Sequence, residues 1–171
     1  MPTLFEFKAK SNRNSELEKR LQQLSPRFAG EDHQVDTYFN VPEGRLKLRE
    51  GIIENALIFY KRSDIAKAKL SDVLLYRCNP DIALKGVLMA ALGIKTVVEK
   101  RRRIWFADNV KIHFDKVERL GEFVEVEVID SNGSISIEKL QEQCLELATF
   151  FDIQPGDYIA GSYSDLLLGM H

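Results

Sequence analysis

The chain has 171 residues, of which 44% are hydrophobic and 29% are charged, and its formal net charge is −2. This length suits one domain with a single core, so we expect residues 1–171 to form one domain. The near-neutral charge argues against a nucleic-acid or membrane-surface partner, because proteins of those classes carry a basic excess.

No apolar run approaches the roughly 20 residues that span a bilayer, and the N-terminus lacks a basic segment followed by an apolar one. The chain contains only two cysteines, Cys78 and Cys144. This number makes a disulfide framework improbable, and we expect a protein of the reducing cytoplasm.

The N-terminal part of the chain predicts a strand followed by a helix. Residues 3–10 alternate between apolar and charged side chains, as a half-buried strand does. Ser15 and Glu18 have the spacing of a capping box at the start of a helix near 15–25, and Pro26 ends that helix.

Strands dominate the next part of the chain. We expect strands at 34–40, 45–50 and 56–62, the first two joined by a turn that contains Pro and Gly. Residues 63–70 are polar and rich in Lys, so they predict a mobile loop before a strand at 71–78.

The second half begins with a helix near 80–92, because Pro suits a first helical turn and Gly93 is a natural stop. Three strands with tight turns follow, at 95–106, 109–116 and 121–129. A helix at 134–151 and a short helix or turn at 162–168 complete the chain.

These elements predict an α+β fold. About eight strands with short, mostly antiparallel connections close naturally into a β-barrel, with the helices packed outside it. The inner face of such a barrel can be polar.

Charged side chains recur at every second position on several of these strands. Residues i, i+2 and i+4 of a strand point to one face, so each segment separates a charged face from an apolar one. If the charged faces turn inward, the barrel encloses eight cations and four carboxylates: Lys8, Lys10, Arg45, Lys47, Arg49, Lys61, Lys100 and Arg102 against Glu6, Asp115, Glu125 and Glu127. On the fourth strand the alternation does not decide whether Lys61 or Arg62 points inward.

A single strand of this kind is more often a solvent-facing strand than part of a site. Several such strands around one interior favour a highly charged ligand, because buried charges are costly unless they are paired. Arg and Lys suit the oxygens of a triphosphate, and carboxylates suit Mg²⁺ or Mn²⁺. The histidines His33 and His113 are more readily explained by structural roles.

The order and spacing of several short motifs resemble those of the CYTH superfamily, the triphosphate tunnel metalloenzymes, and of its class IV adenylyl cyclase-like branch. The motifs are Leu-x-Glu-x-Lys at 4–8, Leu-Lys-Leu-Arg-Glu at 46–50, Tyr-Lys-Arg at 60–62, Val-Glu-Lys-Arg-Arg-Arg-Ile-Trp at 98–105, Leu-Gly-Glu-Phe-Val-Glu-Val-Glu at 120–127 and Ser-Tyr-x-x-Leu-Leu at 162–167.

The resemblance implies an antiparallel eight-stranded tunnel that binds a triphosphate and needs a divalent metal. It implies phosphate-binding roles for Lys8, Lys10, Lys47, Arg49, Lys61, Lys100 and Arg102, and metal-binding roles for Glu6, Asp115, Glu125 and Glu127. Within this set we assign the catalytic positions to Glu6 and Lys8. Leu4 occupies the first acidic position of the family motif, which leaves one metal ion or two open.

Three functions remain open at this point. A cyclase would convert ATP to cyclic AMP and pyrophosphate, a triphosphatase would hydrolyse tripolyphosphate or thiamine triphosphate, and a third possibility is a non-catalytic binder of polyphosphate or nucleotides. The resemblance favours the cyclase. It also suggests a homodimer, whereas we expect neither nucleic acid nor membrane as a partner.

Overall fold

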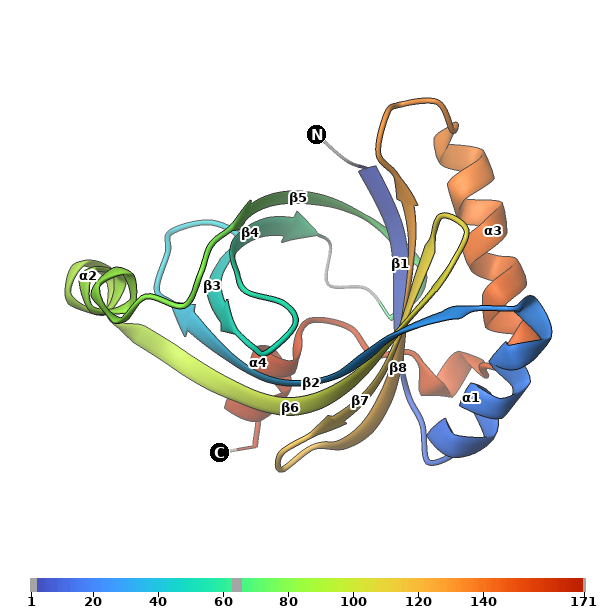
Figure 1. The fold of residues 1–171 in the computed structure, drawn as a ribbon, viewed down its shortest axis with the longest axis horizontal. Helices are drawn as coiled ribbons and strands as arrows, with labels where there is room; N and C mark the ends of the chain where they lie inside the picture. The colour runs from blue at the N-terminus through green and yellow to red at the C-terminus, as the bar shows by residue number, and fades with distance from the viewer. Residues whose placement is uncertain (1–2, 63–65, 171) are drawn as a thin grey trace.

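Eight antiparallel strands close into a barrel within residues 3–62 and 66–170, which this computed structural model describes (Figure 1). Their order around the barrel is β1-β5-β4-β3-β2-β6-β7-β8, and β8 pairs with β1. The strands are β1 (Thr3–Lys10), β2 (Arg27–Phe39), β3 (Arg45–Glu50), β4 (Ala56–Arg62), β5 (Lys69–Arg77), β6 (Ile94–Ala107), β7 (Val110–Val117) and β8 (Gly121–Asp130). The predicted eight-stranded antiparallel barrel is therefore confirmed.

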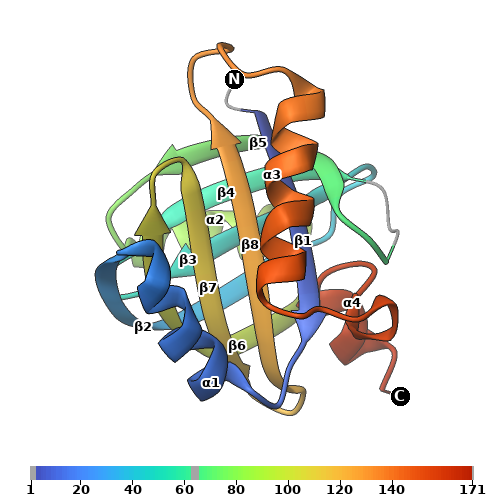
Figure 2. The same ribbon diagram turned by 90° about the vertical axis from the view of Figure 1, so that its right-hand side faces the viewer.

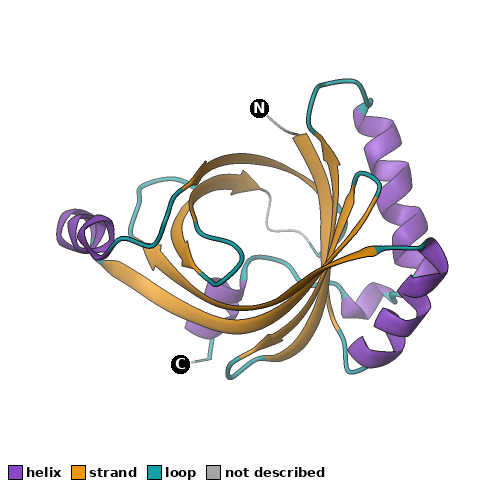
Figure 3. Ribbon diagram, viewed as in Figure 1, coloured by secondary structure: helices purple, strands orange, loops and turns teal. Residues whose placement is uncertain are grey.

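Four α-helices surround this barrel in the described part of the chain: α1 (Asn14–Leu21), α2 (Ile82–Leu92), α3 (Ile137–Phe150) and α4 (Tyr163–Leu168). Figure 2 shows α1 and α3 crossing the outer face of β7, β8 and β1. In Figure 3, α2 lies at the opposite side of the barrel, and α4 lies partly behind β2 and β6. None of the described helices is long and apolar enough to cross a membrane.

Two boundaries differ from the sequence-based prediction for identifiable reasons. The strand β2 begins at Arg27, directly after Pro26, and pairs along β6 as far as Phe106, so long-range pairing extends it well before residue 34. The strand β5 begins at Lys69, inside the segment predicted as a mobile loop, because Lys69 pairs with Glu6 of β1. Residues 63–65 of that predicted loop lie outside the described residues.

The helix starts also differ in detail. Arg13, without a side-chain cap, is the N-cap of α1, so the predicted capping box at Ser15 does not form. The predicted stop of α2 is confirmed: Gly93 has a φ of 72° and its N–H donates to the carbonyl of Met89.

The main hydrophobic core lies outside the barrel wall, between the wall and the helices. The apolar residues of β1, β7 and β8 point outward there and pack against α1 and α3. This core comprises Phe5, Phe7, Ala9, Leu17, Leu21, Val110, Ile112, Phe114, Val124, Val126, Val128, Leu140, Cys144, Ala148 and Phe151. Burial of these side chains on the outer face leaves the alternate positions, which carry the charges, to face the interior.

A second, smaller apolar cluster lies inside the barrel near α4. Tyr163 and Leu167 of α4 pack against inward-facing residues of five strands, Tyr38, Ala56, Ile58, Tyr60, Val98, Val117 and Phe123. Arg45 of β3 holds this helix through an ion pair of 2.6 Å with Asp165. The helix α4 thus fills part of the interior with apolar side chains.

Candidate functional site: a charged tunnel

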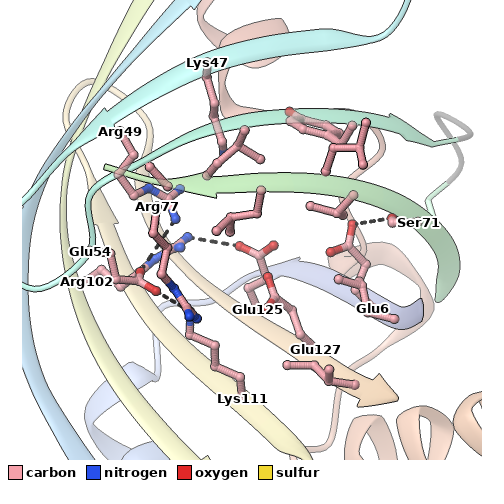
Figure 4. A pocket seen from close by; sticks show the side chains of 18 of the residues that line it. Glu6, Lys47, Arg49, Glu54, Ser71, Arg77, Arg102, Lys111, Glu125 and Glu127 are labelled. Atoms are coloured by element: carbon pink, nitrogen blue, oxygen red, sulfur yellow. Dashed lines mark hydrogen bonds and ion pairs between the residues drawn. The ribbon is translucent and has the colours of Figure 1, made fainter. Parts of the chain in front are cut away.

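A cavity of about 850 Å³ occupies the rest of the barrel interior (Figure 4). Seven cationic side chains line it, Lys8, Lys47, Arg49, Arg77, Lys100, Arg102 and Lys111, with four carboxylates, Glu6, Glu54, Glu125 and Glu127. Apolar side chains form much of the remaining wall, among them Leu4, Ile53, Ala56, Ile58, Val73, Leu75, Phe106 and Ile129. The cavity therefore combines a strongly charged part with an apolar part.

One buried carboxylate organises three of the cations. Asp36 of β2 accepts two hydrogen bonds from Arg49, at 2.9 and 2.8 Å, and one of 2.7 Å from Lys100. The ammonium of Lys47 lies 3.4 Å from the same carboxylate. Burial would raise the pKa of Asp36, but Arg49, Lys100 and Lys47 outweigh it and hold the pKa well below its ordinary value.

A second cluster of buried side chains holds Arg102 in place. Its guanidinium makes two 2.7 Å hydrogen bonds to Asp115 and a third, of 3.1 Å, to Glu125. The hydroxyl of Tyr163 donates to Asp115 at 2.7 Å. Asp115 is therefore fully engaged in orienting Arg102 and Tyr163, and bidentate pairs of this kind restrict the guanidinium to one orientation.

The loop between β3 and β4 contributes Glu54, which contacts Lys111 and lies 3.6 Å from Arg49. Asp32 holds this loop by accepting from the backbone N–H groups of Ile52, Ile53 and Glu54 at 2.7–2.9 Å. A side chain on Gly51 would collide with the Asp32 carboxylate at 2.7 Å. The buried Asp32 thus fixes the position of Glu54 through the backbone.

Carboxylates gather on the wall formed by β1 and β8. Glu6 accepts a hydrogen bond of 3.0 Å from Ser71, and Glu125 lies 3.9 Å from the ammonium of Lys8. Burial, together with the charges of Glu125 and Glu6, raises the pKa of Glu127 to about 7, although Lys111 opposes the shift. Such crowding of carboxylates favours a bound cation.

The residues present fit a divalent cation on this wall. Donor atoms of His113, Glu125 and Glu127 all lie within 4.8 Å of one another. Both ring nitrogens of His113 are buried and lack a hydrogen-bond partner among the described residues, with Nδ1 3.7 Å from Glu125. Burial lowers the pKa of His113 to about 3, so its imidazole is neutral and able to act as a ligand.

The structure places five of the eight predicted cations in the cavity wall: Lys8, Lys47, Arg49, Lys100 and Arg102. Arg45 lies on the same face of β3 but binds Asp165 of α4. Three of the four predicted carboxylates, Glu6, Glu125 and Glu127, also line the cavity, whereas Asp115 lies behind Arg102. Leu4 lines the cavity as well, two residues from Glu6.

Two predicted cations lie elsewhere. Lys61 points to the outer face of β4, because Ala56, Ile58 and Tyr60 take the inward positions, and its ammonium binds Glu43 at 2.6 Å. The side chain of Arg62 is not among those described. Lys10 shares the parity of Lys8, but it is the exposed last residue of β1 and lies beyond the cavity wall.

Sequence reasoning missed several residues of the site. Lys111 lies two positions before His113 on the same face of β7, so the alternation of the strand would have predicted that it points inward. Arg77 likewise shares the face of Ser71 on β5. Glu54 lies in a loop, where no periodicity exists to reveal it. Asp36, which holds three of the cations from behind the cavity wall, was overlooked because its neighbours in the sequence carry no alternating charge pattern.

Comparison with known proteins identifies the class to which this fold and this cavity belong. The profile of the CYTH domain matches residues 5–163, and the chain belongs to the CYTH domain family. No curated protein sequence matches the chain.

Solved structures share the fold over nearly the whole chain. The PH1012 protein of Pyrococcus horikoshii is 23% identical, with a TM-score of 0.77 over 95% of this chain and 98% of that one. A candidate adenylate cyclase of Vibrio parahaemolyticus is 18% identical, with a TM-score of 0.77 over 96% and 97%. A candidate adenylyl cyclase of Hippeastrum with a dominant triphosphatase activity is 12% identical, with a TM-score of 0.62 over 98% and 94%. Identities this low establish the shared fold alone.

Proposed function

We propose that this protein is a metal-dependent enzyme that acts on a triphosphate inside the tunnel, most like a class IV adenylyl cyclase. The observation that carries the proposal is that seven cations line one cavity of the barrel, next to a wall of carboxylates. A triphosphate brings roughly four negative charges, and charge-assisted hydrogen bonds from Arg and Lys are the strongest that its oxygens accept.

The cations divide into two groups with different tasks. Arg49, Lys100 and Lys47, gathered around Asp36, form a preorganised seat for phosphate oxygens, because the buried carboxylate already fixes their positions. Lys8 and Arg102 lie toward the carboxylates, each in contact with Glu125. This second pair is placed to stabilise charge that develops at the reacting phosphorus.

Glu6, Glu125 and Glu127 would hold Mg²⁺ or Mn²⁺, with His113 as a further donor and Asp115 as a support of Arg102. When bound, the ion supplies charge neutralisation at the phosphate oxygens and lowers the pKa of an attacking hydroxyl or water. The catalytic roles that we propose are those of Glu6 and Lys8 on β1. Glu6 helps to hold the ion and accepts a proton from the nucleophile, and Lys8 balances charge on the phosphoryl oxygens.

In the cyclase reaction the ribose 3′-hydroxyl oxygen attacks the α-phosphorus, and the bond from that phosphorus to the bridging oxygen breaks. Pyrophosphate leaves, and the hydroxyl proton passes to a carboxylate. Ile53, Ile58 and Phe106 belong to the apolar part of the cavity wall. They favour a substrate that carries an organic group, because tripolyphosphate has no apolar surface that could pack against them.

A triphosphatase is the second candidate, favoured by the activity of the Hippeastrum protein with the same fold. Water would then attack the terminal phosphorus, and the same cations would stabilise the transition state. Cys78 and Cys144 are free thiols, in keeping with the cytoplasmic location that we propose.

A turnover panel tests the proposal. The purified protein would be incubated with ATP, tripolyphosphate or thiamine triphosphate and Mg²⁺ or Mn²⁺, with phosphate, pyrophosphate and cyclic AMP measured separately. Equal amounts of cyclic AMP and pyrophosphate from ATP support the cyclase, and phosphate release supports the triphosphatase. Binding of all three compounds without turnover would instead identify a non-catalytic binder.

A matched pair of variants ties the activity to the tunnel. Lys47→Ala removes a cation from the cavity wall, whereas Arg101→Ala removes one from the exposed, outward face of β6. We expect the first variant to lose activity and the second to retain it. Equal effects of the two substitutions would contradict a reaction inside the tunnel.

A further inference from the structure

Glu54 reaches the cavity wall from a loop, whereas the other three carboxylates of the wall lie on β1 and β8. The loop, residues 51–55, is closed on itself, because the side-chain amide of Asn55 accepts from the N–H of Gly51 and donates to its carbonyl, both at 2.9 Å. Asp32 of β2 accepts three further hydrogen bonds from the backbone of this loop. The loop therefore holds the Glu54 carboxylate at a fixed place in the tunnel.

Three side chains of the barrel surround this carboxylate. Gln34 donates to Oε1 of Glu54 at 2.8 Å, and the ammonium of Lys111 binds Oε2. Nη1 of Arg49 lies 3.6 Å from Oε1. Burial would raise the pKa of Glu54, but Lys111 and Arg49 outweigh it and hold the pKa below its ordinary value, so the group is an anion at neutral pH. Glu54 thus takes up charge from two cations that line the cavity.

The inward residues of β3 show where along the tunnel Glu54 lies. Arg45 is at the end that α4 fills, where it binds Asp165, and Lys47 and Arg49 follow at every second position and line the cavity. Glu54 comes after Arg49, at the end away from α4, and Figure 4 shows it next to that arginine. The row of cations along this strand therefore ends at a carboxylate.

The same end of the tunnel contains enough cations for a further phosphate. Arg77 of β5 lies level with Arg49, because both residues pair with Ala56 of β4, and its side chain also lines the cavity. Together with Lys111, these residues could offer three cations to one phosphate group. The carboxylate of Glu54 takes up two of the three, Lys111 and Arg49, and leaves Arg77, which is exposed.

We propose that Glu54 sets the length of the phosphate chain that the tunnel accepts, by withholding a fourth phosphate seat at the loop end. The inference rests on the triphosphate site proposed above. A phosphate at this end would have to displace a carboxylate that the loop holds in place, or lie beside it against the repulsion of its charge. Ile53 and Phe106, which line the cavity beside Glu54 and Lys111, suit an uncharged part of a ligand instead.

Calorimetric titration of the full chain with tripolyphosphate and with linear tetraphosphate, both without metal, tests the proposal. The measured quantity is the ratio of the two dissociation constants. In the wild type we expect tetraphosphate to bind no more tightly than tripolyphosphate, despite its larger charge. Glu54→Gln keeps the shape of the side chain and an oxygen for Gln34, but it releases Lys111 and Arg49. It should therefore shift the ratio roughly tenfold in favour of tetraphosphate.

Two further variants show whether the shift comes from this place in the tunnel. Glu43→Gln is the matched control, because Glu43 also binds a lysine, Lys61, at 2.6 Å, but on the outer face of the barrel. It removes the same charge and should leave the ratio unchanged. Adding Lys111→Met to Glu54→Gln should abolish most of the gain, since it deletes the cation that the first substitution released.

The possible failures are distinguishable. Tripolyphosphate binding with the same ratio in the wild type and in Glu54→Gln would overturn this inference alone, and so would an equal shift in Glu43→Gln. If Glu54→Gln does not fold, a wild type that binds tetraphosphate tenfold more tightly than tripolyphosphate would still overturn it. A wild type that binds neither compound would overturn the proposed function as well.

Discussion

The carboxylate of Asp36 lies 2.7 Å from the ammonium of Lys100, and both side chains are about 1% exposed. Asp36 is not part of the cavity wall, yet Lys100 and its neighbours Arg49 and Lys47 all are. The acid therefore acts as a fixed counter-ion behind the phosphate seat that we propose. It neutralises part of the charge of the empty tunnel without meeting the ligand.

Removing this counter-ion should make stability depend on the ligand. In Asp36→Asn, three cations remain crowded without the anion that they share, and breaking such a buried set costs about 3–5 kcal/mol of unfolding free energy. Added tripolyphosphate should restore more stability to this variant than to the wild type, measured by urea unfolding with and without the ligand. Asp32→Asn is the control, since Asp32 accepts from backbone N–H groups, and this variant should gain no more stability from the ligand than the wild type does. A gain as large as that of Asp36→Asn would contradict the assignment.

The pKa of Asp36 predicts a pH window. Its folded-state pKa is depressed below the ordinary value of about 3.9, so its stabilisation is fully present above that value. The stabilisation is lost as the pH falls through the folded-state pKa. We expect the difference in unfolding free energy between wild type and Asp36→Asn to be constant from pH 5 to 8 and to shrink below about pH 4. A difference that grows as the pH falls would refute this.

Lys47 and Arg49 should behave differently although both line the cavity. In Lys47→Ala, Asp36 keeps Arg49 and Lys100, so the fold should tolerate the change while triphosphate binding weakens by about 1.5–3 kcal/mol. Arg49→Ala removes both hydrogen bonds to Asp36, and it should lower the melting temperature as well as weaken triphosphate binding. Calorimetric titration with tripolyphosphate, combined with melting curves, measures both effects. Equal destabilisation by the two variants would show that Lys47 is structural too.

The carboxylate wall predicts a separation of metal binding from phosphate binding. Glu125→Gln keeps the shape of the side chain but loses the charge that attracts a hard cation. We expect it to abolish turnover and weaken Mn²⁺ binding at least tenfold, while metal-free binding of tripolyphosphate is retained. Titration with Mn²⁺ followed by paramagnetic resonance gives a readout independent of activity, and unchanged Mn²⁺ affinity would place the ion elsewhere.

At Leu4 a carboxylate can be added to the site, because this residue lines the cavity beside Glu6. Leu4→Glu should raise Mn²⁺ affinity if a missing carboxylate limits the site, and it should lower the stability of the metal-free protein by adding a buried charge. Thr3→Glu, on the other face of β1, is the matched control and should change neither property. An unchanged Mn²⁺ affinity in Leu4→Glu would indicate that the tunnel works without that ligand.

The alternation of charges predicted much of this arrangement. Strands β3 and β4 have the bounds that the sequence indicates. Parity groups Lys47 with Arg49 on one face of β3, and these two residues and Glu125 line the cavity, as expected if the charged faces turn inward. Parity does not show where a tunnel ends, which is why Lys10 was expected inside, and it did not decide which face of β4 points inward, so Lys61 was placed inside although it lies on the outer face. It also does not distinguish a side chain that lines the cavity from one behind the wall, so Asp115 was expected to line it.

Long-range contacts account for most of what the sequence did not reveal. Asp36 draws its partners from β3 and β6, so only the closed barrel shows that it serves three cations. Glu54 reaches the cavity because Asp32, on another strand, fixes its loop. His113 becomes a candidate ligand only when β8 brings Glu125 beside it.

Strand β1 closes the barrel by pairing with both β5 and β8, and this position has a consequence for how the chain folds. Residues 3–6 pair with Lys69–Asp72 on one edge, and residues 3–10 pair with Phe123–Asp130 on the other. The barrel therefore closes only after residue 130 has been synthesised, and such distant pairing is typical of slowly folding topologies. Until closure, the charges destined for the interior remain in water. Charged side chains on an open strand disfavour its pairing with another chain, so we expect them to oppose edge-to-edge association of unfinished chains.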